Sequence, residues 1–408
     1  MLDSNSIVKL ENLEGDMKPL HNIRLARVST VSFFIDTQLY DQIKMTIASG
    51  ADVSVIASEP SLNRPIHNCK YFSIEISRQI NLAKDLIALI KLYRLFSEQK
   101  FDIVHSVTPK AGFLCALAGI FAGIPLRVHT FTGQPWVTLN GTKRRVSKLA
   151  DKCIGILNTA CYADSVSQKK FLVSSKIIKS NKISVLGKGS VAGVDVRRFD
   201  PREYDKLERS IIKKSLQIPV NSIVLLFVGR IVRDKGVIEL VKAFKDKFTN
   251  DPNVYLLFVG PQELSLSDLG IDKDTASKNR IKFTGYTDTP ERYMSISNML
   301  CIPSYREGFG TVVIEAAAMG IPAIGSKIYG LSDSIIHGET GLLVTPKDSG
   351  ELAKALHKFV YDTELCSKFG QSAQKRALEY FSSTVINKKT IQEYERLLCK
   401  KGIPCDSE

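Results

Sequence analysis

Two successive series of apolar, strand-like runs, each run followed by a helix-like segment, constrain the fold of this chain more than any other feature. Runs such as "DVSVIAS" (52–58) and "SIVLLFVGR" (222–230) have the length of buried strands. Strands that alternate with helices in this way form parallel sheets covered by helices on both faces. The alternation begins near residue 23 and restarts near residue 222, and a chain of 408 residues exceeds one ordinary core. The sequence therefore predicts two sheets.

The predicted fold is α/β, with two doubly wound lobes that face a central cleft. The polar residues 1–22 lack the basic start and apolar run of a signal peptide, and we expect a flexible extension there. Residues 23–190 are predicted to form the first lobe. Residues 191–408, with C-terminal helices from about residue 348, are predicted to form the second. Ligands of doubly wound sheets bind beyond the carboxyl ends of the strands, so the side chains that follow the apolar runs are the candidates for chemistry.

Positive charge is concentrated in the first half of the chain. The net charge is +14, and residues 1–190 carry 25 Lys and Arg against 14 Asp and Glu, whereas residues 191–408 carry 31 against 28. Anionic lipid, nucleic acid and a phosphorylated substrate all fit such a surface, and so does a solvated face without a partner. The uncharged stretch 111–126 is too short for a membrane span of about 20 residues, and it predicts a buried helix.

The stretch "REGFGTVVIEAAAMGIPAIGS" (306–326) carries two carboxylates near the start of a predicted helix. Glu307 lies in the loop after the apolar run "NMLCIPS", and Gly310 and Thr311 open the helix, whose free N–H groups favour a phosphate. Glu315 lies about one turn further, where it can accept hydrogen bonds from a ribose diol. Alternatively, Glu307 is a surface charge and Glu315 a first-turn glutamate that interacts with the helix dipole.

Two further segments place polar side chains after strands. Arg230 and Lys235 in "FVGRIVRDKG" bracket a short loop, and two such cations suit a pyrophosphate, although a solvated turn is the alternative. His129 in "RVHTFTGQPW" is predicted at a strand end, with a buried core histidine as the alternative.

Several common sites find no support in the sequence. The D-x-D at 272–274 lies in a polar stretch, and the eight cysteines form no C-x-x-C, so no metal site is predicted. No G-x-G-x-x-G follows the first strand and no G-x-x-x-x-G-K-[ST] occurs, which removes the usual basis for a nicotinamide or P-loop nucleotide site.

The order and spacing of several motifs resemble one enzyme family. Gly229-Arg230 with Lys235-Gly236, "FTGYTD", "PSYREGFGTVVIEAAAMGIPAIGS" and "GETGLLV" are similar to motifs of the retaining glycosyltransferases with two Rossmann-like lobes (the GT-B fold), often called family 4. The segment "GVDVRRFDP" (193–201) is similar to that family's entry to its second lobe. "HTFTGQ", "ADSVSQKKFL" and "GKGSVAGVD" resemble a bacterial subgroup that builds O-antigen, capsule and other lipid-linked glycans.

The resemblance implies a role for each matching residue. Arg230 and Lys235 would bind the donor diphosphate, Glu307 would contact hydroxyls of the donor sugar, and His129 would approach that sugar from the first lobe. The remaining donor-binding positions are the backbone of Phe309, Gly310 and Thr311, the ribose ligand Glu315, and Gly285 and Tyr286 near the base. One departure is the region "STVSFFIDTQLY" after the first strand, where many members carry a glycine-rich loop and this chain has no glycine.

The function implied is transfer of a hexose or N-acetylhexosamine, with retention, from a nucleotide sugar to a polyprenyl-diphosphate-linked saccharide. A UDP-sugar is favoured over a GDP-sugar as donor, and neither a cofactor nor a metal is expected. The enzyme would be cytoplasmic and peripheral on the inner face of the plasma membrane, where its basic first lobe meets anionic lipid. The alternatives are a nucleotide-sugar epimerase of the same architecture and a non-enzymatic basic protein that binds membrane or nucleic acid. Nucleic acid is disfavoured because aromatic and basic residues are not interleaved.

Overall fold

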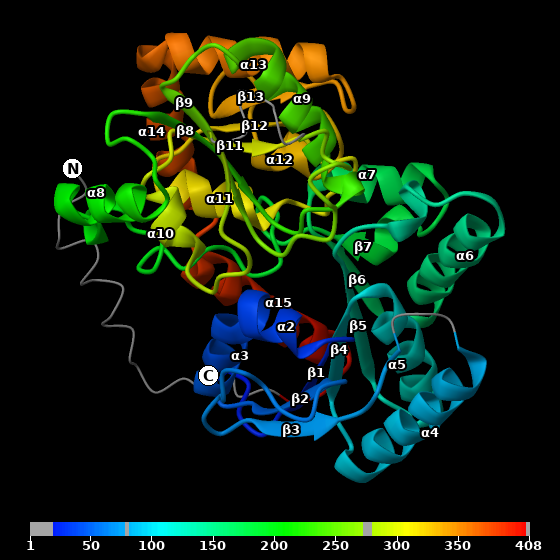
Figure 1. The fold of residues 1–408 in the computed structure, drawn as a ribbon. Helices are drawn as coiled ribbons and strands as arrows, with labels where there is room; N and C mark the ends of the chain where they lie inside the picture. Colours follow the sequence, from blue (N-terminus) through cyan, green and yellow to red (C-terminus); the bar gives the residue numbers. More distant parts are fainter. Residues whose placement is uncertain (1–18, 78–80, 272–279, 405–408) are drawn as a thin grey trace. The chain divides into compact units, whose positions relative to one another are not determined.

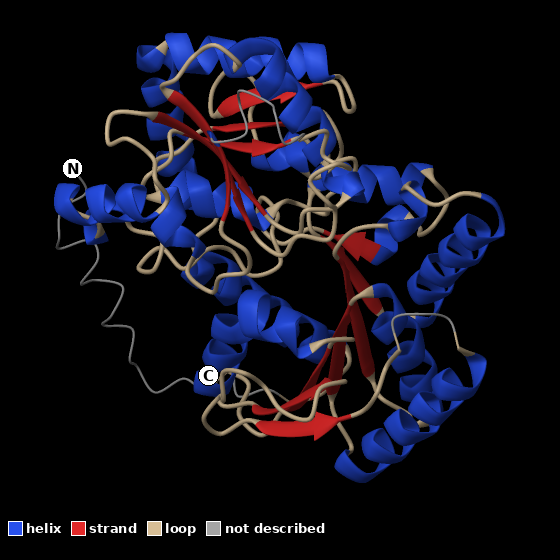
Figure 2. Cartoon of the chain, in the orientation of Figure 1, coloured by secondary structure: helices blue, strands red, loops and turns tan. Residues whose placement is uncertain are grey.

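A computed structural model describes residues 19–77, 81–271 and 280–404 (Figure 1). Most of the predicted extension 1–22 and the D-x-D at 272–274 lie outside the described residues. Helices and strands alternate along most of the chain, and the strands assemble into two sheets (Figure 2). The two doubly wound α/β sheets predicted from the sequence are confirmed.

The first sheet has seven strands in the order β3-β2-β1-β4-β5-β6-β7. Its strands are β1 (Arg24–Val28), β2 (Asp52–Ala57), β3 (Lys70–Ser73), β4 (Ile103–Val107), β5 (Leu126–Phe131), β6 (Ala160–Ala163) and β7 (Ile183–Ser184). The helical segments of this part are α2 (Ser32–Phe34), η1 (Ile35–Leu39), α3 (Tyr40–Ala48), α4 (Leu82–Gln99), α5 (Pro109–Phe121), η2 (Pro135–Val137), α6 (Gly141–Leu157), α7 (Val166–Ser174) and η3 (Ser180–Lys182). The order reverses between β1 and β4, as in doubly wound sheets.

The second sheet has six strands in the order β10-β9-β8-β11-β12-β13. Its strands are β8 (Ile223–Val228), β9 (Val254–Val259), β10 (Ile281–Phe283), β11 (Met299–Ile302), β12 (Ala323–Ser326) and β13 (Gly341–Val344). The helical segments are η4 (Pro201–Glu203), α8 (Lys206–Ser215), η5 (Arg233–Lys235), α9 (Val237–Phe248), α10 (Pro290–Met294), α11 (Thr311–Ala318), α12 (Leu331–Ser334), α13 (Ser349–Tyr361), α14 (Thr363–Tyr380) and α15 (Ser383–Lys400). The order reverses between β8 and β11, which pair in parallel.

The central strands of the second sheet are buried on both faces. Leu225, Leu226 and Phe227 of β8 are fully buried, and the ring of Phe227 lies 5.4 Å from that of Phe258 on β9. Helices α9 and α13 pack side by side against this sheet, and α11 packs on α14 (Figure 1). Burial on both faces is the reason that the run "SIVLLFVGR" is apolar without alternation.

Most of the stretch 111–126 forms a helix, as predicted, but the helix ends at Phe121 and Leu126 already belongs to β5. Helix α5 spans Pro109–Phe121, and Ala111, Leu114 and Cys115 are among its buried residues. None of the helices in the part of the chain that the structure describes is long and apolar enough to cross a membrane.

The chain divides into two compact units. Met1–Ser106, Lys110–Val128 and Asn387–Glu408 form one unit, and Val107–Pro109 and His129–Ile386 form the other. The strands of the first sheet all lie within residues 24–184, and those of the second sheet within residues 223–344, so each predicted lobe contains one sheet. The predicted lobe boundary at residue 190 stays a prediction.

A buried polar cluster fixes the end of α15 within the first unit. The hydroxyl of Tyr394 accepts a hydrogen bond from Arg27 Nη1 at 3.0 Å and lies 2.6 Å from His105 Nδ1. Arg27 and His105 are register partners on β1 and β4, and all three side chains are buried. A buried polar group without its partner costs more than an exposed one, so this contact determines where α15 docks.

We expect Tyr394→Phe to lower the free energy of unfolding by about 1–3 kcal/mol, because it leaves the buried Arg27 guanidinium without this acceptor. Urea denaturation monitored by circular dichroism measures the loss. The control is Tyr93→Phe on α4, whose side chain is 43% exposed. Equal stability of Tyr394→Phe and the wild type would show that the cluster does not anchor α15.

Candidate active site

The switch point of the second sheet brings two predicted site residues together. Because β8 and β11 are parallel neighbours, the loops that follow them leave the same edge of the sheet. Lys235 ends η5, after β8, and Glu307 lies in the loop after β11. Lys235 Nζ and Glu307 Oε1 are 2.5 Å apart, and their side chains are only 24% and 14% exposed. The chain thus places a cation and a carboxylate at the carboxyl edge of the sheet.

Backbone contacts hold these two loops against each other. Gly236 has φ +70°, and a Cβ there would lie 2.0 Å from the carbonyl oxygen of Pro303, so only glycine fits. The backbone N–H of Tyr305 donates to the carbonyl oxygen of Asp234 at 2.9 Å, and Arg306 Nη2 lies 3.0 Å from Asp234 Oδ2. The alternative of a solvated turn implies that Asp234 is an ordinary surface charge, which these contacts contradict. Asp234 joins the two loops.

Glu307 has a second hydrogen-bond donor that the sequence analysis missed. The buried hydroxyl of Ser304 donates to Glu307 Oε1 at 2.8 Å, so the Lys235 ammonium and this hydroxyl bind the same oxygen. Two donors fix the orientation of this carboxylate. A residue that binds the hydroxyl groups of a sugar, as predicted for Glu307, needs such a fixed orientation. The only sequence signal for Ser304 is a hydroxyl residue directly after an apolar strand.

The helix predicted after Glu307 begins where the sequence placed it. Gly310, with φ +81°, is the N-cap of α11, and Thr311 is the first helical residue. No side chain among the described residues caps this end. The backbone of Phe309 is a predicted donor-binding position. The Phe309 side chain is buried in the core, where its ring lies 5.1 Å from that of Phe381. The N–H groups at the start of α11 therefore belong to a rigid loop.

Glu315 lies in the second turn of α11, and the first turn holds no acidic residue. This position contradicts the alternative that Glu315 is a first-turn residue that serves the helix dipole. Burial raises the pKa of the Glu315 carboxyl to about 7, Arg198 opposes this rise, and Glu291 adds to it. The carboxyl therefore exists in both protonation states near neutral pH.

The other predicted donor residues follow strands β8 and β10 of the same sheet and make different contacts. Arg230 follows β8 and pairs with Glu263 Oε1 at 3.0 Å, and both side chains are about half exposed. The carbonyl oxygen of Gly285, after β10, accepts from the N–H of Gly260 at 2.9 Å, and Tyr286 is 62% exposed. The ligand roles of Arg230, Gly285 and Tyr286 stay predictions.

His129 lies inside a strand and not at its end. It is the fourth residue of β5, is 1% exposed, and meets the ring of Phe131 edge-on at 4.7 Å. Burial lowers the pKa of its imidazole to about 3, so the ring is neutral at physiological pH. This environment matches the buried-histidine alternative, and a contact of His129 with the donor sugar stays a prediction.

The start of α7 supports the Glu307 loop through contacts that the sequence did not reveal. Ser165 Oγ donates to the carbonyl oxygen of Gly308 at 3.1 Å. The N–H of Ser167 donates to Asp333 Oδ2 at 2.9 Å, and Ser167 Oγ accepts from the N–H of Gly330 at 2.8 Å. The stretch "ADSVSQKKFL" does not reveal these contacts, because the partners of its two serines are more than 140 residues away.

The region without glycine after β1 has its own explanation. The first N–H of α2, on Ser32, donates to Glu59 Oε2 at 2.6 Å. A protein carboxylate thus satisfies the backbone N–H at the start of this segment.

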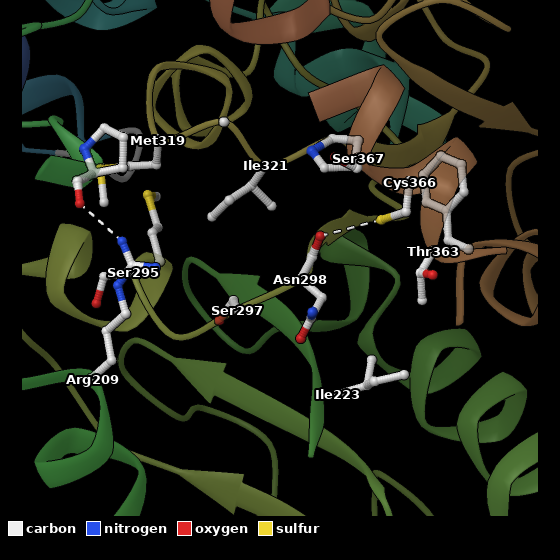
Figure 3. A pocket seen from close by; sticks show the side chains of 15 residues that line it. Arg209, Ile223, Ser295, Ser297, Asn298, Met319, Ile321, Thr363, Cys366 and Ser367 are labelled. Atoms are coloured by element: carbon white, nitrogen blue, oxygen red, sulfur yellow. Dashed lines mark hydrogen bonds between the residues drawn. The ribbon is translucent and has the colours of Figure 1, made fainter. Parts of the chain in front are cut away.

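Among the residues that the structure describes, no group of three or more His, Cys, Asp or Glu side chains gathers into a possible metal site. The absence of a metal requirement stays a prediction. A cavity of about 270 Å³ is lined by Ile223, Asn298 and Pro322, among other residues (Figure 3). These three residues lie at the amino ends of β8, β11 and β12, whereas Lys235 and Glu307 follow the carboxyl ends of β8 and β11. In the lining of this cavity, Cys366 Sγ donates to the carbonyl oxygen of Asn298.

The geometry suits an anionic ligand that also carries hydroxyl groups. A lysine ammonium next to a helix N-terminus can stabilise a diphosphate and the charge that develops when it leaves. Glu307 and Glu315 supply acceptors at the two ends of the same segment, one for each of two hydroxylated groups.

Comparisons with known proteins agree with this geometry. Residues 208–376 match the family described as "Glycosyl transferases group 1", and residues 35–158 match the "Glycosyl transferase 4-like domain". The capsular polysaccharide biosynthesis glycosyltransferase CapM of Staphylococcus aureus is 32% identical over 93% of this chain and 98% of its own length. The UDP-Gal:alpha-D-GlcNAc-diphosphoundecaprenol alpha-1,3-galactosyltransferase of Escherichia coli is 29% identical over 72% of this chain and 76% of its own length.

The fold is that of the GT-B enzymes. Sucrose-phosphate synthase from Thermosynechococcus elongatus matches 92% of this chain with all of its own, at a TM-score of 0.74 and 20% identity. The sequence resemblance is therefore confirmed: the chain belongs to the group 1 glycosyltransferases and is a glycosyltransferase.

We expect Lys235→Ala to weaken UDP binding roughly tenfold to a hundredfold, because a charge-assisted hydrogen bond contributes about 1.5–3 kcal/mol. Isothermal titration measures the affinity, and circular dichroism checks the fold. Arg233→Ala, in the same turn but exposed, is the matched control. Unchanged affinity of Lys235→Ala would remove this lysine from the donor site.

Proposed function

We propose that this protein transfers a hexosyl or N-acetylhexosaminyl group, with retention, from a UDP-sugar to a polyprenyl-diphosphate-linked saccharide in the synthesis of a bacterial surface polysaccharide. The observation that carries the proposal is the Lys235–Glu307 pair at the β8/β11 switch point, directly before the N-terminus of α11. Lys235 and the N-terminus of α11 bind the diphosphate of the donor. Glu307 binds the sugar that is transferred when the diphosphate leaves.

The choice of donor and acceptor rests on the relatives. The Escherichia coli relative is named for UDP-Gal as donor and for a GlcNAc-diphosphoundecaprenol acceptor, and the Staphylococcus aureus relative for capsular polysaccharide. UDP-hexoses such as UDP-Gal carry the sugar in α linkage, and the name of the former relative specifies an α-1,3 product. That relative therefore keeps the anomeric configuration, which supports retention in this chain. A GDP-sugar is the second choice of donor.

The acceptor chemistry requires access to a lipid surface, and two helices offer suitable faces. Helix α6 exposes Val146, Leu149 and Ile156 along one stripe. It also carries five cations, and its single acid, Asp151, is buried. Helix α4 exposes several large apolar side chains: Leu82, Leu86, Ile87, Ile90 and Tyr93. Basic helices with exposed apolar stripes bind the anionic cytoplasmic leaflet, so we place the enzyme there as a peripheral protein.

The alternatives considered from the sequence lose support. The matched family and relatives are transferases, which favours transfer over epimerisation and over a non-enzymatic binding role.

The test of the function is a transfer assay with purified protein, several UDP- and GDP-sugars, EDTA, and a synthetic polyprenyl-diphosphate-linked GlcNAc acceptor. We expect an elongated lipid product from a UDP-hexose or UDP-N-acetylhexosamine, with an α linkage by NMR. The matched control is Glu307→Gln, for which we expect a rate lower by about 10²–10³-fold. Release of UDP with an altered sugar and no lipid product would indicate an epimerase. Transfer that EDTA abolishes would contradict the metal-independent mechanism.

We expect Lys143→Glu, Arg144→Glu and Arg145→Glu, combined, to reduce binding to anionic vesicles by several kcal/mol, because each cation near such a surface contributes about 1 kcal/mol. Vesicle co-sedimentation with phosphatidylglycerol measures the binding. Reversal of three exposed lysines elsewhere, Lys354, Lys358 and Lys368, keeps the same net charge and serves as control. An equal loss in both variants would mean that net charge, and not α6, drives the association.

A further inference from the structure

Arg198 connects two parts of the donor site that the sequence analysis treated separately. Its Nη2 donates to the carbonyl oxygen of Asp288 and to Glu291 Oε2, the latter at 2.8 Å. Asp288 belongs to the segment after β10 that also carries Gly285 and Tyr286, and Glu291 lies in the first turn of α10. One guanidinium therefore holds the loop predicted to lie near the base.

The backbone that carries Arg198 is itself fixed. Asp195 Oδ1 accepts hydrogen bonds from the N–H groups of Arg197 at 3.0 Å and Arg198 at 3.4 Å. The next residue, Phe199, is 4% exposed and belongs to the core of the second sheet. The Arg198 side chain, 34% exposed, therefore starts from a rigid position and keeps some access to solvent.

The charges of Arg198 and Glu291 also act on Glu315 of α11, the helix that α10 contacts. Arg198, from the 193–200 segment, lowers the pKa of the Glu315 carboxyl, and Glu291, from α10, raises it. Helix α14, which packs on α11, directs Arg376 to backbone carbonyl oxygens of Asp333 and Ser334 in α12. Arg198 is thus the cation that acts on Glu315, the predicted ribose ligand.

We propose that Arg198 is a positioning residue for the nucleoside end of the donor, a role that rests on the proposed function. It fixes the 284–289 loop against α10, and it offsets the charge of Glu291 so that Glu315 meets the ribose as a carboxylate. An ionised carboxylate accepts a hydrogen bond from each hydroxyl of a diol, whereas a protonated one must itself donate. Arg198 therefore favours the ionised form of Glu315, which can accept hydrogen bonds from the ribose hydroxyls.

This role makes donor affinity depend on pH in a defined direction. Burial places the pKa of Glu315 at about 7, so affinity should rise as the pH increases through that value. Without Arg198, the Glu315 pKa rises further and the increase in affinity moves to higher pH. Without the charge of Glu291, the Glu315 pKa falls and the increase moves to lower pH.

The experiment measures binding of UDP-glucose by isothermal titration from about pH 6 to about pH 8.5, a range in which the phosphates of this diester do not titrate. The proteins are the full-length wild type, Arg198→Gln, Glu291→Gln, and Arg197→Gln as an exposed neighbouring control. We expect Arg198→Gln to bind about tenfold more weakly near pH 7 and to recover part of this loss at about pH 8.5. We expect Glu291→Gln to bind more tightly than the wild type at about pH 6, and Arg197→Gln to match the wild type.

The outcomes distinguish a failure of the proposed Arg198 role from a failure of the proposed function. Wild-type binding with the same pH profile in Arg198→Gln overturns the inference alone. A loss in Arg198→Gln by one constant factor at every pH overturns the electrostatic role. Failure of the wild type to bind UDP-glucose at any pH overturns the proposed donor site, and the inference with it. Because Glu291→Gln retains Arg198, its opposite shift tests the same claim if Arg198→Gln does not fold.

Discussion

The parallel pairing of β8 with β11 is the constraint on which the candidate site depends. Each strand is followed by a loop that leaves the same edge of the sheet, and the strand order reverses between them. Loops at such a point diverge to opposite faces and leave room for a ligand. Here they carry Lys235 and Glu307, whose charged atoms meet at 2.5 Å. If the two strands were not neighbours, these residues would lie on separate parts of the sheet edge.

The Lys235–Glu307 pair contributes to orientation more than to stability. Both side chains are largely removed from water, and the cost of desolvating two charges offsets much of their attraction. The hydrogen bond from Ser304 and the bonds that Asp234 makes across the loops fix the geometry of the pair. At the other end of the segment, Arg198 lowers the pKa of Glu315 and Glu291 raises it. Each predicted carboxylate therefore has a cation that sets its charge or its direction.

Much of the site could be predicted because its residues follow strands in a recognisable pattern. Glu307 and the start of α11 after Gly310 lie where the sequence placed them, since a strand-loop-helix unit is a local structure. His129 was less predictable. Whether a polar residue near the end of an apolar run lies inside the strand or after it depends on the neighbouring strands, and His129 lies inside β5. Helix α6 was not predicted at all, because its basic face resembles a solvated segment.

The sequence by itself determined the two doubly wound sheets, the enzyme family, and the loops that carry the candidate chemistry. All of these depend on patterns within a few tens of residues, such as continuous apolar strands and glycine at a helix start. The tertiary structure decided which distant groups complete the site. Ser167 bonds Asp333, Arg198 bonds Glu291, and Tyr394 docks on β1. The two partners of each contact are distant in sequence, and the fold brings them together. No local pattern encodes such a pairing, so it follows only from the packing of the chain.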